Sequence, residues 1–273
     1  MRRGPAAVAV LAAAMVLTGP VPQAHAAGCD ENELYAFVTG SSGDFDSGDI
    51  LALSTRAKTL SGTGKPVDNR QTGGGANAIN PLTGVHWFTV KGNQTYSTHP
   101  HGTPYHWRDL SGPSVKDGFG FRKDGYGYFL AETGGRVDVY SFWHERPAGR
   151  QRISLSGMDE NPVDLAFDGR DRAWLVTADG SLWRVDDVRS SSWRARLAYA
   201  ADNSGERVEG IALGRLDGKE TIFVSGSYSS GERFVSRAEP DGKEVWYDPL
   251  PALSGSGSIT DLASCSYPSL GSY

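Results

Sequence analysis

The chain has 273 residues, with 35 glycines and 10% aromatic residues, and its 38% hydrophobic content excludes a disordered chain. Many glycines beside many Trp and Tyr residues favour an all-β fold with tight turns. The net charge of −5 argues against nucleic acid and anionic membranes as partners, because both attract clustered Lys and Arg.

The first 26 residues have the pattern of a secretory signal peptide. Arg2 and Arg3 precede an apolar and small-residue run at 6–18, and Ala24-His25-Ala26 fits a cleavage site. The run is shorter than the roughly 20 apolar residues of a membrane-spanning helix. We therefore expect a secreted, extracellular mature chain, 27–273, without membrane insertion. Its net charge is −7, because cleavage removes two arginines and no acidic residue.

Two cysteines, Cys29 and Cys265, lie near the two ends of the mature chain. Export places them in an oxidising compartment, which favours a disulfide bond between them. No matching Cys or His pair accompanies them, so a zinc site is not indicated.

A repeated pattern of a small residue followed by a core residue recurs every 40–51 residues. The five copies lie at 77–79, 117–119, 163–165, 209–211 and 260–262. Each of the first four copies is followed by three further strand-like runs. In chain order, the four sets of runs lie at 85–90, 94–98 and 105–110; at 128–131, 136–142 and 152–155; at 173–177, 181–185 and 193–199; and at 221–225, 233–237 and 243–247.

The fifth unit is split between the two ends of the chain. The run 259–264 supplies its first strand, and the runs 34–38, 50–54 and 57–61 supply the other three. Four-stranded units of 40–50 residues and a split repeat are typical of β-propellers. The sequence predicts one domain over 27–273, an all-β, five-bladed β-propeller whose split closing blade is locked by the disulfide.

Acidic and amide side chains fall at the start of each predicted first strand, where the central channel of a propeller opens: Asn77, Asp117, Asp164, Glu209 and Asp261. Relative to the core residue, Asp164 and Asp261 lie one place later than the others, so the two sets cannot face the same way unless a bulge intervenes. Three interpretations stay open. The acids could hold Ca²⁺, could supply the acid and base of a glycoside hydrolase, or could bind backbone N–H groups of neighbouring blades.

Histidines and aromatic residues suggest two further sites. His99, His101 and His106 lie in one segment, which is either a metal site or an exposed polar loop. Stacking aromatic side chains next to polar groups are typical of sugar-binding sites. The candidates for such ligand contacts are Tyr105, His106, Trp107, Trp193 and Arg194.

No motif of a serine hydrolase, a zinc protease or a nucleotide-binding enzyme is present. The segments Asn77-Ala78-Ile79-Asn80-Pro81, 181–186 and 259–265 resemble secreted, lectin-like β-propellers of high-GC Gram-positive bacteria. This resemblance implies export and the propeller fold, but no established reaction. The chain lacks the Asn-Asp-Pro-Asn-Gly motif of invertase-like hydrolases, and its blades are less alike than those of repeat lectins.

We therefore expect a secreted, non-enzymatic binding module for a glycan, a cell-surface partner or another exported protein, without a cofactor unless Ca²⁺ occupies the channel. The first alternative is a glycoside hydrolase or lyase that uses Asp117, Asp164, Glu209 or Asp261. The second is a scaffold for protein interaction. The candidates for metal ligands are Asp164, Asp261, His99 and His101.

Overall fold

The computed structural model contains strands and turns and, in its described part, no helix. The structure describes residues 32–39, 50–55, 59–62, 76–90, 94–98, 105–106, 115–144, 146–201, 205–231, 233–238 and 258–264. No helix that is long and apolar enough to cross a membrane occurs among them. The predicted signal peptide, Cys29, Cys265 and the run 243–247 lie outside these residues.

The described strands form five separate sheets, each of which starts from one of the repeated segments. The first is β4 (Asn77–Ile79), β5 (His86–Val90), β6 (Gln94–Thr98) and β7 (Tyr105–His106). The second is β8 (Val115–Phe121), β9 (Tyr126–Thr133), β10 (Arg136–Trp143) and β11 (Arg146–Ser156), with β15 (Ser192–Arg194) as a fifth strand.

The remaining sheets follow in chain order. The third is β12 (Pro162–Phe167), β13 (Ala173–Thr177), β14 (Leu182–Val185) and β16 (Arg196–Tyr199). The fourth is β17 (Arg207–Leu216), β18 (Lys219–Ser227) and β19 (Arg233–Ala238). The fifth joins β20 (Ser258–Ser264) to β1 (Glu33–Thr39), β2 (Ile50–Ser54) and β3 (Thr59–Gly62).

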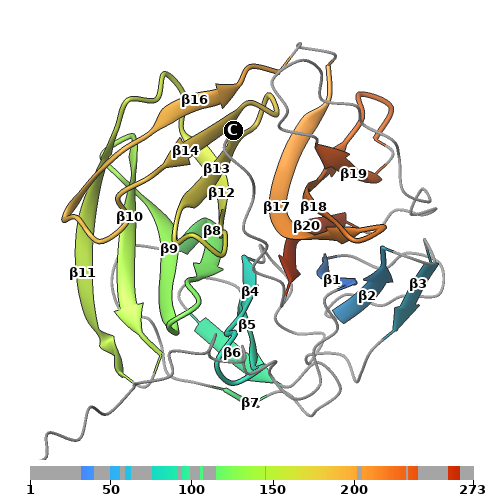
Figure 1. The fold of residues 1–273 in the computed structure, drawn as a ribbon, viewed down its shortest axis with the longest axis horizontal. Helices are drawn as coiled ribbons and strands as arrows, with labels where there is room; N and C mark the ends of the chain where they lie inside the picture. Colours follow the sequence, from blue (N-terminus) through green and yellow to red (C-terminus); the bar gives the residue numbers. More distant parts are fainter. Residues whose placement is uncertain are drawn as a thin grey trace, which may run out of the picture.

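The five sheets stand around a common axis, with the first strand of each repeat innermost (Figure 1). Strand β4 packs against β8, β8 against β12, β12 against β17, β17 against β20, and β20 against β4 again. The inner strands therefore form a closed ring, which is the arrangement of a β-propeller.

Hydrophobic packing closes the same circle. Each of the five core clusters of the described residues joins two neighbouring sheets, and together the clusters link every sheet to the next. Along each inner strand, large side chains such as Phe119 and Leu165 face the preceding sheet, and small residues such as Ala78 and Ala212 face the following one. Small residues on one face allow the sheets to approach closely near the axis.

The predicted split unit is confirmed at the level of strand pairing. Strand β1 pairs antiparallel with β20 on one edge and with β2 on the other, so that Ala36 lies opposite both Leu262 and Leu51. The first and the last described strands of the chain are therefore neighbours in one sheet.

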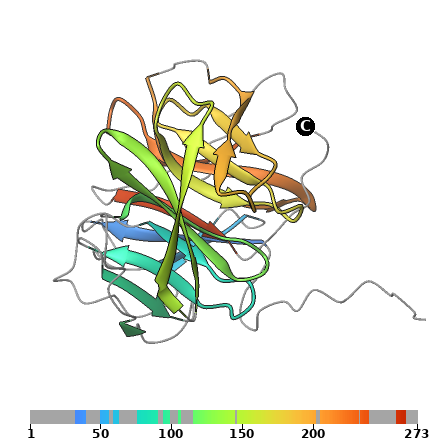
Figure 2. The ribbon, with the colours of Figure 1, turned by 90° about the vertical axis from the view of Figure 1, so that its left-hand side faces the viewer.

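One connection departs from the expected pattern. The run 193–199, expected as a single outer strand, is divided at Ala195 into β15 and β16. Strand β15 pairs in parallel with β11 of the preceding sheet, whereas β16 pairs with β14 of its own sheet. Figure 2 shows the long β11 crossing the side of the molecule where this exchange occurs.

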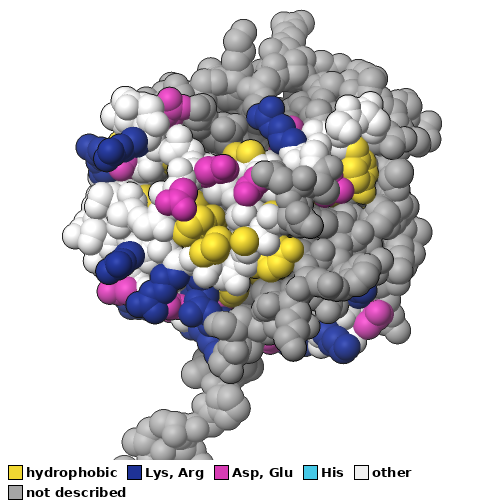
Figure 3. Space-filling view, turned by 90° about the horizontal axis from the view of Figure 1, so that it is seen from above, with side chains coloured by type: hydrophobic (Ala, Val, Ile, Leu, Met, Phe, Trp, Pro, Cys, Tyr) yellow, Lys and Arg dark blue, Asp and Glu magenta, His cyan; other side chains and the backbone are white. Residues whose placement is uncertain are grey.

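The outer edge at β16 presents both apolar and charged groups. Leu197 on this strand is 51% exposed, and both Arg194 and Arg196 are exposed. Viewed from the side of β16, hydrophobic side chains lie between acidic and basic ones (Figure 3).

Candidate functional site

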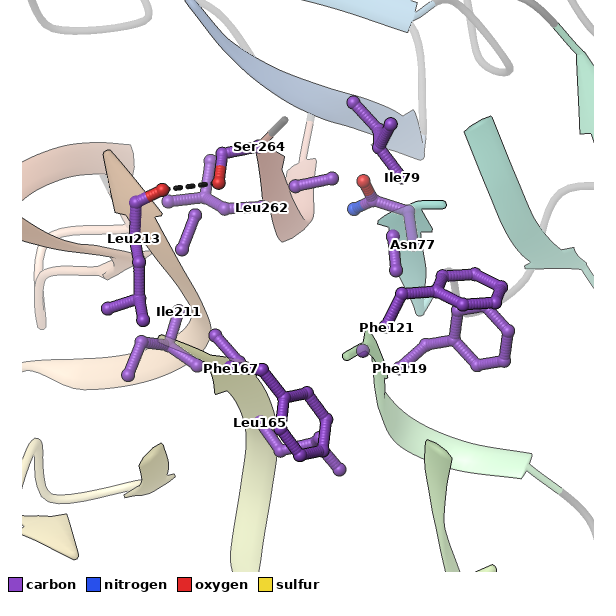
Figure 4. Close-up of a pocket in the computed structure, with 15 residues that line it drawn as sticks. Asn77, Ile79, Phe119, Phe121, Leu165, Phe167, Ile211, Leu213, Leu262 and Ser264 are labelled. Atoms are coloured by element: carbon purple, nitrogen blue, oxygen red, sulfur yellow. Dashed lines mark hydrogen bonds between the residues drawn. The ribbon is translucent and has the colours of Figure 1, made fainter. Parts of the chain in front are cut away.

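The axis of the ring contains a narrow cavity of about 30 Å³, lined by three residues from each inner strand (Figure 4). One water molecule requires about 10–15 Å³ measured in this way. The cavity therefore has room for water but not for a sugar or a peptide side chain.

Two aspartates lie at the small-residue position of the inner strands. The residue before the core position is Ala78 in β4, Gly118 in β8, Asp164 in β12, Gly210 in β17 and Asp261 in β20. Each aspartate follows a glycine around the ring. A Cβ atom on Gly118 would lie 2.7 Å from Cα of Asp164, and one on Gly210 would lie 2.9 Å from Cα of Asp261. The two glycines therefore leave the space that the aspartates need.

Asp164 binds backbone groups of three inner strands. Its Oδ1 accepts from the N–H of Leu165 at 2.6 Å, and its Oδ2 accepts from the N–H of Ile211 in β17 at 2.6 Å. A further backbone hydrogen bond comes from Phe119 in β8. One carboxyl group therefore connects β8, β12 and β17.

Asp261 performs the same role for the other two inner strands. Its Oδ1 accepts from the N–H of Leu262 at 2.7 Å, and its Oδ2 accepts from the N–H of Asn77 in β4. Both aspartates are fully buried. Together the two side chains bind backbone groups of all five inner strands.

The two carboxyl groups also hydrogen-bond to each other, which requires a shared proton. Burial raises the pKa of Asp164 to about 7, although its hydrogen bonds to Asp261 and to backbone N–H groups lower it in part. Burial, followed by the charge of Asp164, raises the pKa of Asp261 well above its usual value. The pair therefore favours a state with one proton and one charge.

A second buried polar pair lies beside the cavity. His86 Nε2 lies 2.9 Å from Oδ1 of Asn77, and both residues are fully buried. Burial lowers the pKa of His86 to about 3, so its ring is neutral at physiological pH. Nδ2 of Asn77 and Nδ1 of His86 have no hydrogen-bond partner among the described residues. The Asn77 amide nitrogen points toward the cavity, where a water molecule would satisfy it (Figure 4).

Among the other predicted channel acids, only the side chain of Glu209 is described, and it takes no part in this pair. Glu209 is half-buried, and Nε of Arg207 lies 3.9 Å from its Oε1. Asp117 is in β8, but its side chain lies outside the described part of the structure. The predicted ring of acids is thus reduced, among the described residues, to the pair Asp164 and Asp261.

The prediction that Trp193 contacts a ligand is wrong. Its ring is fully buried in a core cluster, 5.4 Å from the ring of Tyr128, and its Nε1 donates to the carbonyl of Val188. Its indole face is therefore not available at the surface. Arg194, the next residue, is exposed.

The predicted histidine and aromatic segment is described only in part. Tyr105 and His106 form β7, which pairs with β6, but their side chains are outside the described part. His99, His101 and Trp107 lie outside it entirely. Among the described residues, no group of three or more His, Cys, Asp or Glu side chains could hold a metal ion.

No protein-family model matches the sequence, and a comparison with curated proteins finds no match. Solved structures do match. A protein described as a gluconolactonase is 15% identical, with 80% of each chain covered and a TM-score of 0.50. The GH43_1 enzyme from Xanthomonas citri is 12% identical, over 82% of this chain and 95% of that chain, with a TM-score of 0.49. A protein described as TolB from Agrobacterium tumefaciens is 14% identical, over 85% of each chain, with a TM-score of 0.48.

At these identities the first of the matches shows the fold alone. This chain is a β-propeller, in agreement with the ring of sheets described above.

Proposed function

We propose that this protein is a secreted, non-enzymatic binding module that recognises carbohydrate or a cell-surface partner through its outer surface. The observation that carries the proposal is the use of both channel aspartates as backbone ligands. A carboxyl group that is fully buried and already accepts N–H groups cannot reach a substrate. The cavity beside it also holds no more than water.

The glycoside hydrolase alternative loses its best candidates for the same reason. A hydrolase needs two carboxyl groups on either side of a bound sugar, about 5–9 Å apart. Asp164 and Asp261 instead hydrogen-bond directly to each other. Their raised pKa values, which are common at active sites, here follow from burial.

The number of blades, the split closing blade and the disulfide are part of the same proposal. Five sheets in the described residues and the pairing of β20 with β1 support a five-bladed propeller with a split closing blade. Cys265 follows β20 directly, and Cys29 precedes β1 by four residues. A disulfide between them would connect adjacent strands of the closing sheet, consistent with export.

The test uses the chain without residues 1–26. Binding to an array of glycans and to intact bacterial cells is measured, and circular dichroism verifies folding. We expect binding that Asp164→Asn leaves intact wherever this variant folds. A folded protein that binds neither glycans nor cells would overturn the proposal, as would hydrolysis of an array glycan. Mass spectrometry without reduction tests the disulfide, and two free thiols would exclude it.

A further inference from the structure

Three turns meet at one end of the β4 and β8 sheets. The turn after β4 carries Leu82, the turn after β8 carries Gly125, and the turn after β10 carries His144. A Cβ atom on Gly125 would lie 2.8 Å from Cδ1 of Leu82 and 3.1 Å from Nδ1 of His144. The same His144 nitrogen lies 3.1 Å from the carbonyl oxygen of Gly125. Gly125 has a φ of +86°, which favours glycine, so this close approach depends on it.

Aromatic rings gather at this point. Tyr126 and Trp143 lie directly opposite each other at the end of the β9–β10 pair, with ring centroids 5.0 Å apart. The ring of His144 lies 4.4 Å from that of Trp143. Tyr126 is 41% exposed and Leu82 is 53% exposed, and these are two of the three large exposed hydrophobic residues in the described part of the chain. Within the described part of the chain, exposed large hydrophobic side chains are therefore concentrated here.

An oriented carboxylate borders the rings. Arg122 Nε donates to Oδ1 of Asp124 at 2.8 Å, and a second guanidinium nitrogen binds Oδ2. The Arg122 side chain is only 6% exposed, whereas that of Asp124 is 36% exposed. Arg122 also binds the hydroxyl of Tyr128, and its guanidinium carbon lies 5.2 Å from the centre of the Tyr126 ring. A buried cation thus fixes the carboxylate and leaves part of it accessible.

The charge of this surface is balanced. The carboxylate of Asp124 is neutralised by Arg122, and the neighbouring Lys123 faces Asp171 at 3.6 Å. A charged ligand would find no unpaired opposite charge in these groups. An uncharged ligand with an apolar face and hydroxyl groups matches them, because an aromatic ring stacks on sugar C–H groups and a carboxylate accepts from hydroxyls.

We propose that Leu82, Asp124, Tyr126, Trp143 and His144, the three-turn surface, form a shallow binding site for an uncharged pyranose unit of a glycan. This inference rests on the proposed binding function and names the ligand class and the place. Tyr126 and Trp143 supply the stacking surface, and Asp124 supplies the hydroxyl acceptor. Because the site is open, it can receive a sugar unit within a glycan chain or at the end of that chain.

The test measures the affinity of neutral oligosaccharides selected on the array, by calorimetry and by saturation-transfer NMR. Tyr126→Ala and Asp124→Asn should each weaken binding at least tenfold. Leu197→Ala is the matched control, because Leu197 is an exposed apolar residue on a different sheet, and it should leave the affinity unchanged. Circular dichroism and a thermal melt verify that each variant folds.

The outcomes separate this inference from the proposed function. Neutral-glycan binding that survives both Tyr126→Ala and Asp124→Asn overturns the site but leaves the binding function standing. Binding to cells or to charged glycans only, with none to neutral oligosaccharides, also overturns the site. Absence of any binding by the folded wild type overturns both.

Discussion

Two aspartates of this chain illustrate how surroundings assign a role to the same side chain. Asp164 at the axis is fully buried, and burial raises its pKa to about 7. Asp124 at the three-turn surface is partly exposed. Burial raises its pKa somewhat, but the hydrogen bond and charge of Arg122 outweigh this, and the net pKa is lowered. The first carboxyl group holds strands together, and the second remains charged and accessible.

A carboxyl group with a shifted pKa is therefore not by itself a functional site. At the axis the pKa shifts come first from desolvation, and the carboxyl oxygens are bound by backbone N–H groups and by the other aspartate. At the three-turn surface a paired cation keeps the carboxylate ionised while leaving part of it free. The second environment, although less perturbed, is the one suited to a ligand.

The largest expected effect comes from removing an axial carboxyl group. Asp164→Ala leaves the N–H groups of Leu165 and Ile211 without their acceptor in a buried site. We expect a loss of about 2–4 kcal/mol in the free energy of unfolding, measured by chemical denaturation. Asp124→Asn is the matched variant at the surface; because it keeps an acceptor oxygen for the buried Arg122 guanidinium, it should cost less than about 1 kcal/mol. Equal losses in the two variants would contradict the contrast between the two environments.

The next effect concerns the space beside Asp261. Gly210→Ala places a methyl group 2.9 Å from Cα of Asp261 and from the backbone nitrogen of Leu262, where neither can move independently. A loss of about 1–3 kcal/mol is expected in the same denaturation experiment. Ala78→Gly provides the control, because it removes a methyl group at the same ring position. A neutral Gly210→Ala variant would show that the inner strands are less closely packed than described.

The third effect is the dependence of stability on pH. The pKa of Asp164 is raised from 3.8 to about 7, so the folded state binds more protons in that window, and stability falls as the pH rises through it. The pKa of His86 is lowered from 6.5 to about 3, so His86 has the opposite effect below pH 6.5. Above pH 6.5 the aspartates lower the stability with rising pH, and His86 no longer offsets this decrease.

Unfolding free energies measured between pH 6.5 and pH 8 should therefore decrease, by up to about 1.4 kcal/mol per pH unit for each proton released. Asp164→Asn should flatten this decrease, because the remaining carboxyl group no longer shares a proton. A wild-type protein whose stability rises over this interval would exclude the shared proton.

The smallest effect on stability is expected at the three-turn surface. Tyr126→Ala removes an exposed ring and its contact with the Arg122 guanidinium, which is worth about 0.5–1 kcal/mol at an exposed site. Differential scanning calorimetry should show a shift in Tm of only a few degrees. A large loss of stability would mean that Tyr126 serves packing and not recognition.

Much of the fold could be predicted from local patterns. The runs 94–98 and 173–177 match β6 and β13 residue for residue, because β-branched and aromatic residues between turn residues specify short strands. The split closing sheet was predicted from the position of 259–264 in the repeat. Such features depend on neighbours in the sequence or on the period of the repeat.

The candidate site depends on contacts between sheets, which a single sequence does not report. The sequence shows that Asp164 and Asp261 lie one place closer to the core residue than the other acids. It does not show that Gly118 and Gly210 on the neighbouring strands leave the space that these two aspartates occupy. The burial of Trp193 follows from β15 leaving its own sheet to pair with β11, and no local pattern signals this exchange.

The three-turn surface gave only a partial signal in the sequence. Trp143 directly follows the predicted run 136–142, but its partner Tyr126 is brought opposite by the register of the β9–β10 hairpin. Leu82 reaches the same place from a different sheet. The cluster therefore exists only after the sheets have assembled.

The pairing of β1 with β20 has a topological consequence. Because this pairing closes the ring, the fold has no sheet that must come first, and the chain can begin at another loop. The turn at Gly134 and Gly135 suits such a break, since a side chain at either position would meet no other atom. A circular permutant that starts at Gly135, with the native ends joined by a linker, should assemble the same ring.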